Sequence, residues 1–190
     1  PTTLDAAPSR PQRIYAAGVG AFKAFGTVVR SDDSGATWAE SSFDMRGAHT
    51  PWVAGVDVLD AERVWVRLDG DERDELLLST NGGQRFDSVH LAPELPGFAL
   101  SPDGATIAVG GPSDGVSIAS TKDPVFKRTS PVHARCLAWT RDGLWACGDD
   151  ALDGFSLGLS TDGGKTFASK LRLRDLTPLA CVRDSCAKAW

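Results

Sequence analysis

The side chains best suited to chemistry in this sequence are three histidines, four cysteines and two short acidic stretches. His49, His90 and His133 share no metal-site spacing, either with one another or with the cysteines. No Gly-x-Ser-x-Gly elbow and no phosphate-binding loop occurs. We therefore predict no catalytic residue, no metal site and no cofactor.

The two acidic stretches, residues 69–75 and 149–154, place carboxylates close to glycine, a pattern that could ligate Ca²⁺. The spacing of an EF-hand is not met, and Arg73 inside the first stretch would repel a cation. We interpret both stretches as solvated loops between strands.

The four cysteines lie in the last third of the chain, and their even number fits two disulfides and an oxidising compartment. Three pairings are open. A turn around residues 141–143 would fold a hairpin that brings Cys136 opposite Cys147, within reach of a disulfide. Cys181 and Cys186 would then close a small loop after the last strand. The alternative is that some of the four are buried free thiols.

A repeated motif indicates which elements must position these residues. Residues 31–38 read SDDSGATW, and the copies at 79–86 and 160–167 read STNGGQRF and STDGGKTF. A worn copy begins at Ser120. The four starts are 48, 41 and 40 residues apart. A period of about 40 to 45 residues is the length of one blade of a β-propeller.

Short runs rich in Val, Leu, Trp and Phe surround each copy, with Asp, Gly and Asn between them, and helical periodicity is absent. The sequence predicts an all-β fold, a β-propeller of about four four-stranded blades over residues 13–177. Most closed propellers have more blades, so we expect part of a larger one. Residues 1–12 are expected to be a disordered lead-in and 178–190 a disulfide-containing tail. The innermost strand of the first blade is unclear.

The motif Ser-x-Asp-x-Gly-x-Thr-Trp resembles the Asp-box, or BNR repeat, of sialidases, sortilin-type receptors and secreted bacterial propellers. The copy at 31–38 matches every defining position, the copy at 160–167 has Phe for Trp, and the copy at 79–86 also departs at Asn81 and Arg85. The resemblance implies a propeller and leaves the function open. The box residues are Ser31, Asp33, Gly35, Trp38, Ser79, Asn81, Gly83, Phe86, Ser160, Asp162, Gly164 and Phe167.

Physical reasons for the box residue types favour a structural role. The Asp33 or Asp162 carboxylate accepts backbone N–H groups across the turn between the third and fourth strands of a blade. The glycines allow a positive φ. The aromatic residue that ends each box is expected to tuck beneath the turn into the blade core.

The resemblance also raises sialidase chemistry, which needs an arginine triad, a tyrosine–glutamate pair and an acid–base aspartate. The chain has a single tyrosine, Tyr15, and the run Arg13-Ile14-Tyr15 is a poor imitation of the arginine motif. The alternative is therefore a glycan-processing enzyme whose catalytic residues lie on other blades.

Four tryptophans of the predicted blades lie outside the box motifs, and they are the candidate ligand-binding residues. Trp stacks on sugars and anchors peptides at the loops of a propeller. The competing interpretation, which we favour, is that they form core between blades. They are Trp52, Trp65, Trp139 and Trp145.

Composition and charge narrow the class of function. The 190 residues are 42% hydrophobic, carry a net charge of −5 and contain no apolar run long enough to span a membrane. No basic cluster favours nucleic acid. The chain begins at Pro1, so we expect that an upstream piece was removed. We predict a secreted, periplasmic or cell-surface scaffold or binding propeller for a protein or glycan. A third hypothesis is a structural subunit whose propeller is completed by upstream blades or another chain.

Overall fold

The computed structural model describes residues 1–20 and 25–177, which form four four-stranded antiparallel sheets, each in simple meander order. The first blade contains β1 (Thr3–Ala6), β2 (Ile14–Val19), β3 (Phe25–Ser31) and β4 (Ala39–Asp44). The second contains β5 (Thr50–Val56), β6 (Val64–Asp69), β7 (Asp74–Ser79) and β8 (Asp87–Ala92). The third contains β9 (Gly97–Leu100), β10 (Thr106–Gly111), β11 (Gly115–Ser120) and β12 (Lys127–Ser130). The fourth contains β13 (Cys136–Thr140), β14 (Gly143–Cys147), β15 (Leu157–Ser160) and β16 (Ala168–Leu171), followed by the 3₁₀ turn η1 (Leu173–Asp175).

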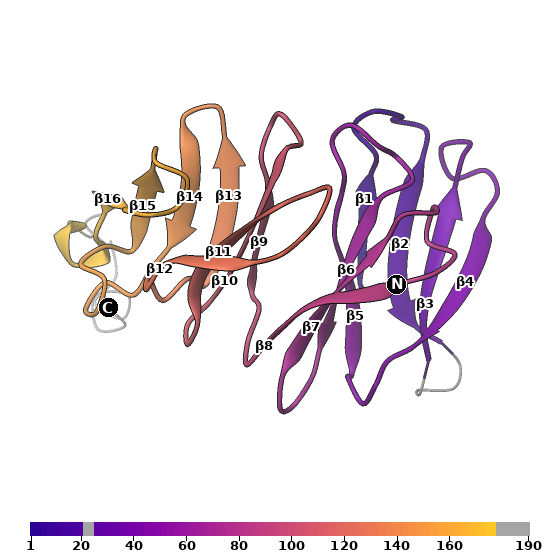
Figure 1. The fold of residues 1–190 in the computed structure, drawn as a ribbon, viewed down its shortest axis with the longest axis horizontal. Coiled ribbons are helices and arrows are strands. Elements are labelled where there is room, and N and C mark those ends of the chain that lie inside the picture. The colour runs from indigo at the N-terminus through magenta and orange to yellow at the C-terminus, as the bar shows by residue number, and fades with distance from the viewer. Residues whose placement is uncertain (21–24, 178–190) are drawn as a thin grey trace, which may run out of the picture.

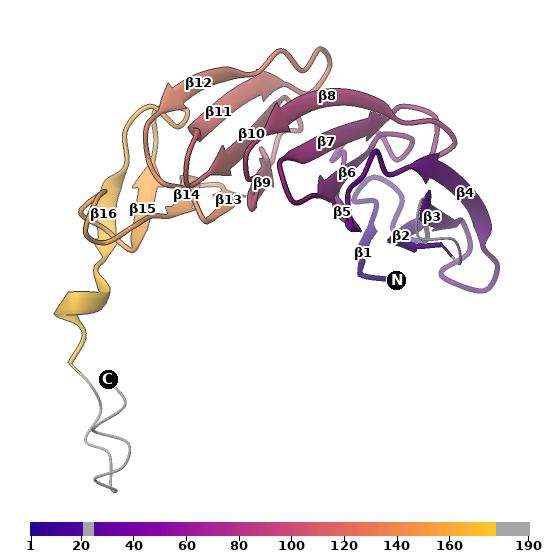
Figure 2. The ribbon, with the colours of Figure 1, turned by 90° about the horizontal axis from the view of Figure 1, so that it is seen from below.

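The four blades stand side by side along the chain (Figure 1) and together follow an open arc (Figure 2). The first strand of each blade lies on the concave side of the arc, and β4, β8 and β12 lie on the convex side. The all-β prediction of about four four-stranded blades is confirmed. No helix among the described residues is long and apolar enough to cross a membrane.

The hydrophobic core lies between the blades, because each blade buries both faces of its sheet only against its neighbours. Tyr15 and Val28 of the first blade pack with Val64 and Val66 of the second. Another cluster of buried residues joins the second blade to the third. One more cluster joins the third blade to the fourth. Burial of apolar area at these three junctions is the main force that holds the arc together.

The opening residues are ordered, which corrects the expectation of a disordered lead-in at 1–12. Thr3 to Ala6 form β1, the innermost strand that was unclear in the sequence. Thr3 Oγ1 accepts a hydrogen bond from the Val53 amide at 2.6 Å, and Asp5 Oδ2 accepts one from the Val56 amide at 3.1 Å. The polar side chains of Thr3 and Asp5 therefore attach β1 to the second blade. Burial raises the pKa of Asp5, against the effect of its two amide donors.

The third blade also differs from expectation at its worn box. Ser120 is exposed, whereas Thr121 is 3% exposed and its hydroxyl donates to the Gly104 carbonyl at 2.6 Å. Arg63 of the second blade donates to the Thr121 carbonyl. Thr121 therefore lies on the side of its blade that faces the preceding blade, the side on which Ser79 and Ser160 lie in the second and fourth blades. The box position is thus one residue later than the sequence suggested.

One disulfide forms in the fourth blade. Cys136 and Cys147 are directly opposite in the β13–β14 register, with their Cα atoms 5.0 Å apart. This pairing confirms the prediction from the hairpin. Cys181 and Cys186, together with the expected tail at 178–190, lie outside the described residues.

Candidate functional site

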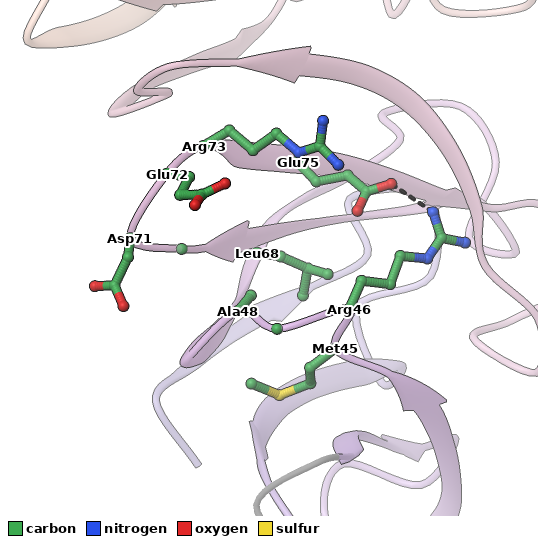
Figure 3. Close-up of a pocket in the computed structure, with 10 residues that line it drawn as sticks. Met45, Arg46, Ala48, Leu68, Asp71, Glu72, Arg73 and Glu75 are labelled. Carbon is green, nitrogen blue, oxygen red and sulfur yellow. Dashed lines mark hydrogen bonds and ion pairs between the residues drawn. The ribbon is translucent and has the colours of Figure 1, made fainter.

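A cavity of about 310 Å³ lies at the junction of the first two blades (Figure 3). Its base is apolar and consists of Met45, Ala48 and Leu68. Its rim is charged, with Arg46 from the turn that connects the first two blades and the β6–β7 hairpin from the second blade. The residues that line it are Met45, Arg46, Gly47, Ala48, Leu68, Gly70, Asp71, Glu72, Arg73 and Glu75.

A tight turn between β4 and β5 places Arg46 on this rim. The Arg46 amide donates to Asp44 Oδ1 at 2.8 Å, and the Ala48 amide donates to the Met45 carbonyl at 2.8 Å. Arg46 itself has a φ of 51°, a conformation that is uncommon for residues with a side chain. The turn therefore directs the guanidinium across the junction, toward the second blade.

An ion pair over the cavity connects the β4–β5 turn to β7 of the second blade. Arg46 Nη1 lies 2.6 Å from Glu75 Oε1, and the Glu75 side chain is only 10% exposed. Figure 3 draws this pair at one end of the cavity and Asp71 at the other. A guanidinium and several carboxylates thus surround an apolar base.

The β6–β7 hairpin is held in place by a buried carboxylate at its end. Asp74 Oδ1 accepts the Gly70 amide at 3.2 Å, and Asp74 Oδ2 accepts the Leu95 amide at 2.7 Å. At the hairpin tip, Asp71 lies 2.8 Å from Nε2 of His49, the residue directly before β5. Residues 71–73 of the acidic stretch 69–75 are exposed, in agreement with the interpretation as a solvated loop, whereas Asp74 and Glu75 are buried in the wall of the cavity.

The other side of the same hairpin lines a second, wider cavity of about 630 Å³ between the second and third blades. Asp71 and Glu72 belong to both cavities, and Glu94 approaches from the loop that leads into the third blade. Arg67 contributes the positive charge here and donates to the Leu95 carbonyl at 3.0 Å. One face of the molecule thus carries two adjacent clefts separated by one hairpin.

The four candidate tryptophans do not form a single site. Trp65 is fully buried, with its ring 6.1 Å from that of Phe98, so its prediction as a ligand contact is wrong. Trp52 is partly buried, and the Arg67 guanidinium lies over its ring at 5.6 Å. The Trp52 side chain therefore supports the residue that lines the second cavity.

The two tryptophans of the fourth blade lie on opposite faces of the sheet. Trp139 packs against the core between the third and fourth blades and lines a shallow hollow there. It also lines a second hollow, which is formed by the first strands of the second, third and fourth blades together with Asp5. Trp145 is partly exposed, and its Nε1 donates to Thr140 Oγ1 at 3.1 Å. Neither residue reaches the cavity at the first junction.

The box carboxylates make the hydrogen bonds that a structural role requires. Asp33 accepts bonds from the Thr37 hydroxyl, the Thr37 amide and the Ser31 hydroxyl, which lower its pKa to about 2. The Thr166 amide and hydroxyl and the Ser160 hydroxyl likewise lower the pKa of Asp162. The glycines of the three boxes have φ of 94°, 81° and 77° at Gly35, Gly83 and Gly164.

The box aromatics behave differently from one another. Phe86 and Phe167 are partly buried against the core between blades, and the Phe86 ring lies 5.1 Å from that of Phe43. Trp38 is 48% exposed, so the expectation that it tucks into the blade core is wrong. The reason is that a box aromatic packs against the preceding blade, and among the described residues no blade precedes the first.

The second acidic stretch is held by internal hydrogen bonds. Asp153 Oδ2 accepts the Asp149 amide at 2.7 Å, and Asp153 Oδ1 lies 2.9 Å from His133 Nδ1. The Leu152 and Ala151 amides lower the pKa of Asp149. Across residues 1–20 and 25–177 no group of three or more His, Cys, Asp or Glu side chains is arranged to hold a metal ion.

Sequence reasoning did not find Arg46, the residue that spans the first junction. The only signal was the Asp-Met-Arg-Gly run at 44–47, whose Asp and Gly are typical of a tight turn. Nothing in that run indicates that the arginine points across to another blade, since the partner Glu75 is far away in the chain.

No family model and no curated protein matches this chain. Solved structures do match. The GH74 xyloglucanase of Xanthomonas campestris has a TM-score of 0.59 at 19% identity, over 87% of this chain and 31% of that chain. The WD40 domain of Neurospora crassa Pan2 has a TM-score of 0.52 at 13% identity, over 89% of this chain and 48% of that one.

A chain in a nidogen–laminin complex also matches, with a TM-score of 0.51 at 10% identity, over 72% of this chain and 51% of that one. This chain therefore spans from about a third to a half of the structures that it resembles. At these identities the likeness concerns the fold alone. The fold is that of a β-propeller, of which four blades are described here.

Proposed function

We propose that this chain is a non-catalytic, extracellular binding propeller of the Asp-box type, and that it binds a protein ligand at the cavity between the first two blades. The observation that carries the proposal is the charged rim of that cavity over an apolar base. Both signs of charge are present, with Arg46 and Arg73 beside Asp71, Glu72 and Glu75. Such a rim suits a polypeptide segment that presents acidic, basic and apolar side chains together.

A protein ligand fits this cavity better than a glycan does. Protein sites that recognise sugars commonly offer an aromatic platform, whereas the side chains that line this cavity are aliphatic or charged. The nearest candidate platform, Trp52, has Arg67 over its ring. The disulfide between Cys136 and Cys147 supports the extracellular assignment, because disulfides persist in oxidising compartments.

A non-catalytic role is supported by what the perturbed carboxylates do. The carboxyl groups whose pKa is lowered lie in turns and ion pairs, where backbone amides, hydroxyls and arginines explain the shift. Asp5, whose pKa is raised by burial, is the exception, and its two oxygens accept the Val56 and Ala6 amides. Shifted pKa values at a catalytic centre would instead gather several groups in one cleft. A scaffold or binding role needs a surface that contacts the partner, and it needs no side chain with a catalytic pKa.

The test is to probe an array of immobilised peptides and an array of glycans with the purified chain. We expect peptides with mixed charge to bind, and Arg46→Ala to weaken that binding at least about 10-fold, as for a central interface residue. Lys122→Ala, at an exposed position on the third blade, is the matched control and should leave binding unchanged. Binding to glycans alone, or peptide binding that Arg46→Ala leaves intact, would overturn the proposal.

A further inference from the structure

The hollow that Trp139 lines between the third and fourth blades has a volume of about 440 Å³, and we call it the Trp139 hollow. Its walls are the β9–β10 turn, the β13–β14 turn and the box of the fourth blade. In an antiparallel meander these turns share one end of the sheets, whereas the β6–β7 hairpin beside the cavity of Figure 3 is at the other end. The Trp139 hollow is therefore a separate surface on the opposite face of the molecule.

Trp139 supplies the aromatic surface of this hollow. Its ring packs against the core between the third and fourth blades, while the side chain stays partly exposed. In the same blade, Trp145 Nε1 donates its hydrogen bond to Thr140 Oγ1. Within residues 1–20 and 25–177, Trp139 Nε1 has no acceptor, and it is not among the buried unpaired atoms. Trp139 thus offers a ligand both an apolar ring and a hydrogen-bond donor.

Charged side chains of two turns surround the tryptophan. The Ser101 hydroxyl and the Ala105 amide donate to Oδ1 of Asp103 at 2.5 and 3.0 Å, and these bonds lower the pKa of Asp103. Oδ2 of this exposed carboxylate accepts no hydrogen bond from the described part of the chain, so a ligand can reach it. Arg141 and Asp142, in the β13–β14 turn, are exposed as well. The rim therefore carries two carboxylate acceptors and one guanidinium donor.

This combination of groups matches the surface of a sugar. One face of a pyranose ring consists of C–H groups that pack on an indole, and the edge of the ring carries hydroxyls that need both donors and acceptors. The hydroxyls of Thr106 and Thr161 also line the hollow, and each can donate and accept. Because the carboxylates outnumber the single guanidinium, an anionic sugar is disfavoured. The volume of about 440 Å³ lies in the range of small-molecule sites.

We propose that the Trp139 hollow binds a neutral glycan, one pyranose ring of which stacks on Trp139 while its hydroxyls bond to the charged rim. The cavity at the first junction has no aromatic residue in its lining, so the two sites take ligands of different chemistry. The glycan site does not rest on the peptide cavity, and either one can fail without the other. Every residue that lines the hollow belongs to the third or fourth blade.

Titration calorimetry of the purified chain with cellohexaose, mannohexaose and chitohexaose tests the site, and hexagalacturonate tests the preference for neutral sugars. We expect at least one neutral hexaose to bind, and to bind more tightly than hexagalacturonate. Trp139→Ala should weaken this binding at least about 10-fold, as for a central aromatic anchor. Trp38→Ala removes an exposed tryptophan of the first blade, and as the matched control it should leave the affinity unchanged.

Two further variants separate binding from folding. Trp139→Phe keeps an aromatic ring against the core but removes the Nε1–H, so its affinity should lie between those of the parent and Trp139→Ala. Asp142→Ala changes an exposed turn residue and should weaken binding about 10-fold, as for one hydrogen bond to a charged group. Asp123→Ala, at an exposed position of the third blade, should have no effect, and both aspartate variants should keep the circular dichroism spectrum of the parent.

Three results would overturn the proposal. The first is that none of the neutral hexaoses binds, or that hexagalacturonate binds at least as tightly. The second is that Trp139→Phe and Asp142→Ala both bind the sugar as tightly as the parent does. The third is that peptides of mixed charge displace the sugar, because both ligands would then share one site.

Discussion

The Thr37 hydroxyl donates a hydrogen bond to Oδ2 of Asp33 at 2.6 Å, while the Thr37 amide donates to Oδ1 of the same carboxylate at 2.8 Å. The pair Asp162 and Thr166 repeats this arrangement, with the hydroxyl at 2.7 Å and the amide at 3.0 Å. In the second box both residues are different. Asn81 Oδ1 accepts the Arg85 amide at 3.0 Å, and Arg85 has no hydroxyl that would need a second acceptor. The carboxylate and the threonine are therefore present together or absent together.

Removing the hydroxyl should destabilise a box that has the carboxylate. Thr166→Val leaves Oδ2 of Asp162 without its donor, and we expect the melting temperature to fall by about 2–4 °C, the shift typical of one hydrogen bond in a domain of this size. Calorimetry measures the effect. The combined change Asn81→Asp and Arg85→Thr should raise the melting temperature. Asn81→Asp alone should raise it less, and equal effects would contradict the coupling.

Stability should fall as the solution becomes acidic. The pKa of Asp33 is lowered to about 2, and that of Asp162 is lowered as well, relative to their unfolded values. Carboxyl groups with a lowered folded-state pKa stabilise the protein above the unfolded pKa, and this contribution is lost as the pH falls toward the folded one. We expect urea midpoints to decrease between about pH 4 and about pH 2. The double variant Asp33→Asn and Asp162→Asn should show a flatter dependence, and an unchanged slope would contradict this account.

The Cys136–Cys147 disulfide should stabilise the fourth blade. The bond closes a loop with a sequence separation of 11 residues. Loops of this size give about 2–3 kcal/mol through the restricted unfolded state. The variant with both residues changed to Ser should unfold at a lower urea concentration, with a free energy of unfolding reduced by about 2–3 kcal/mol. If the parent chain and the variant unfold identically in the absence of reductant, the bond makes no contribution.

Arg13 should be among the most sensitive positions at the first junction. Its side chain is 4% exposed, pairs with Asp32 at 2.5 Å, and also pairs with Glu62 of the second blade. Burial lowers the pKa of Arg13, but the hydrogen bonds to the Glu62 and Asp32 carboxylates outweigh this effect, so that the pKa is raised. Arg13→Ala removes the buried guanidinium, while Arg30 stays beside both carboxylates and Arg10 beside Asp32. We therefore expect a loss of about 2 kcal/mol in the free energy of unfolding, the scale of hydrogen bonds to charged groups.

Arg13→Lys is the informative companion in that experiment. A lysine keeps the charge but offers one point donor in place of the planar fork that spans both carboxylates. We expect an intermediate loss by urea denaturation. A lysine variant as stable as the parent would mean that charge alone, without the fork geometry, holds the junction.

The architecture was predictable from the sequence because the box is a local motif. Its serine, acid and glycine specify one turn through contacts within a few residues, and the period between copies then specifies a blade. The Cys136–Cys147 bond was predictable for the same reason, since both residues belong to one hairpin with a recognisable turn.

Features that depend on distant parts of the chain were not predictable in this way. Trp65 and Trp145 have similar sequence contexts, yet one is fully buried and the other partly exposed, because only the first has a following blade among the described residues. β1 was missed because its polar side chains bond to β5, about 50 residues away. The Arg46–Glu75 pair likewise depends on how two blades dock.

Because the contacts between strands of different blades join neighbouring blades, the arc behaves as a one-dimensional array in which each unit is stabilised by the units on either side. Of the junctions described here, opening of the second or third blade breaks two, whereas opening of the first or fourth breaks one. Amide protons of β6 and β10 should therefore exchange only with near-global unfolding, and those of β16 should exchange through a smaller local opening. Local stability in this protein is thus determined by a blade's place in the array, even where two blades share the same motif.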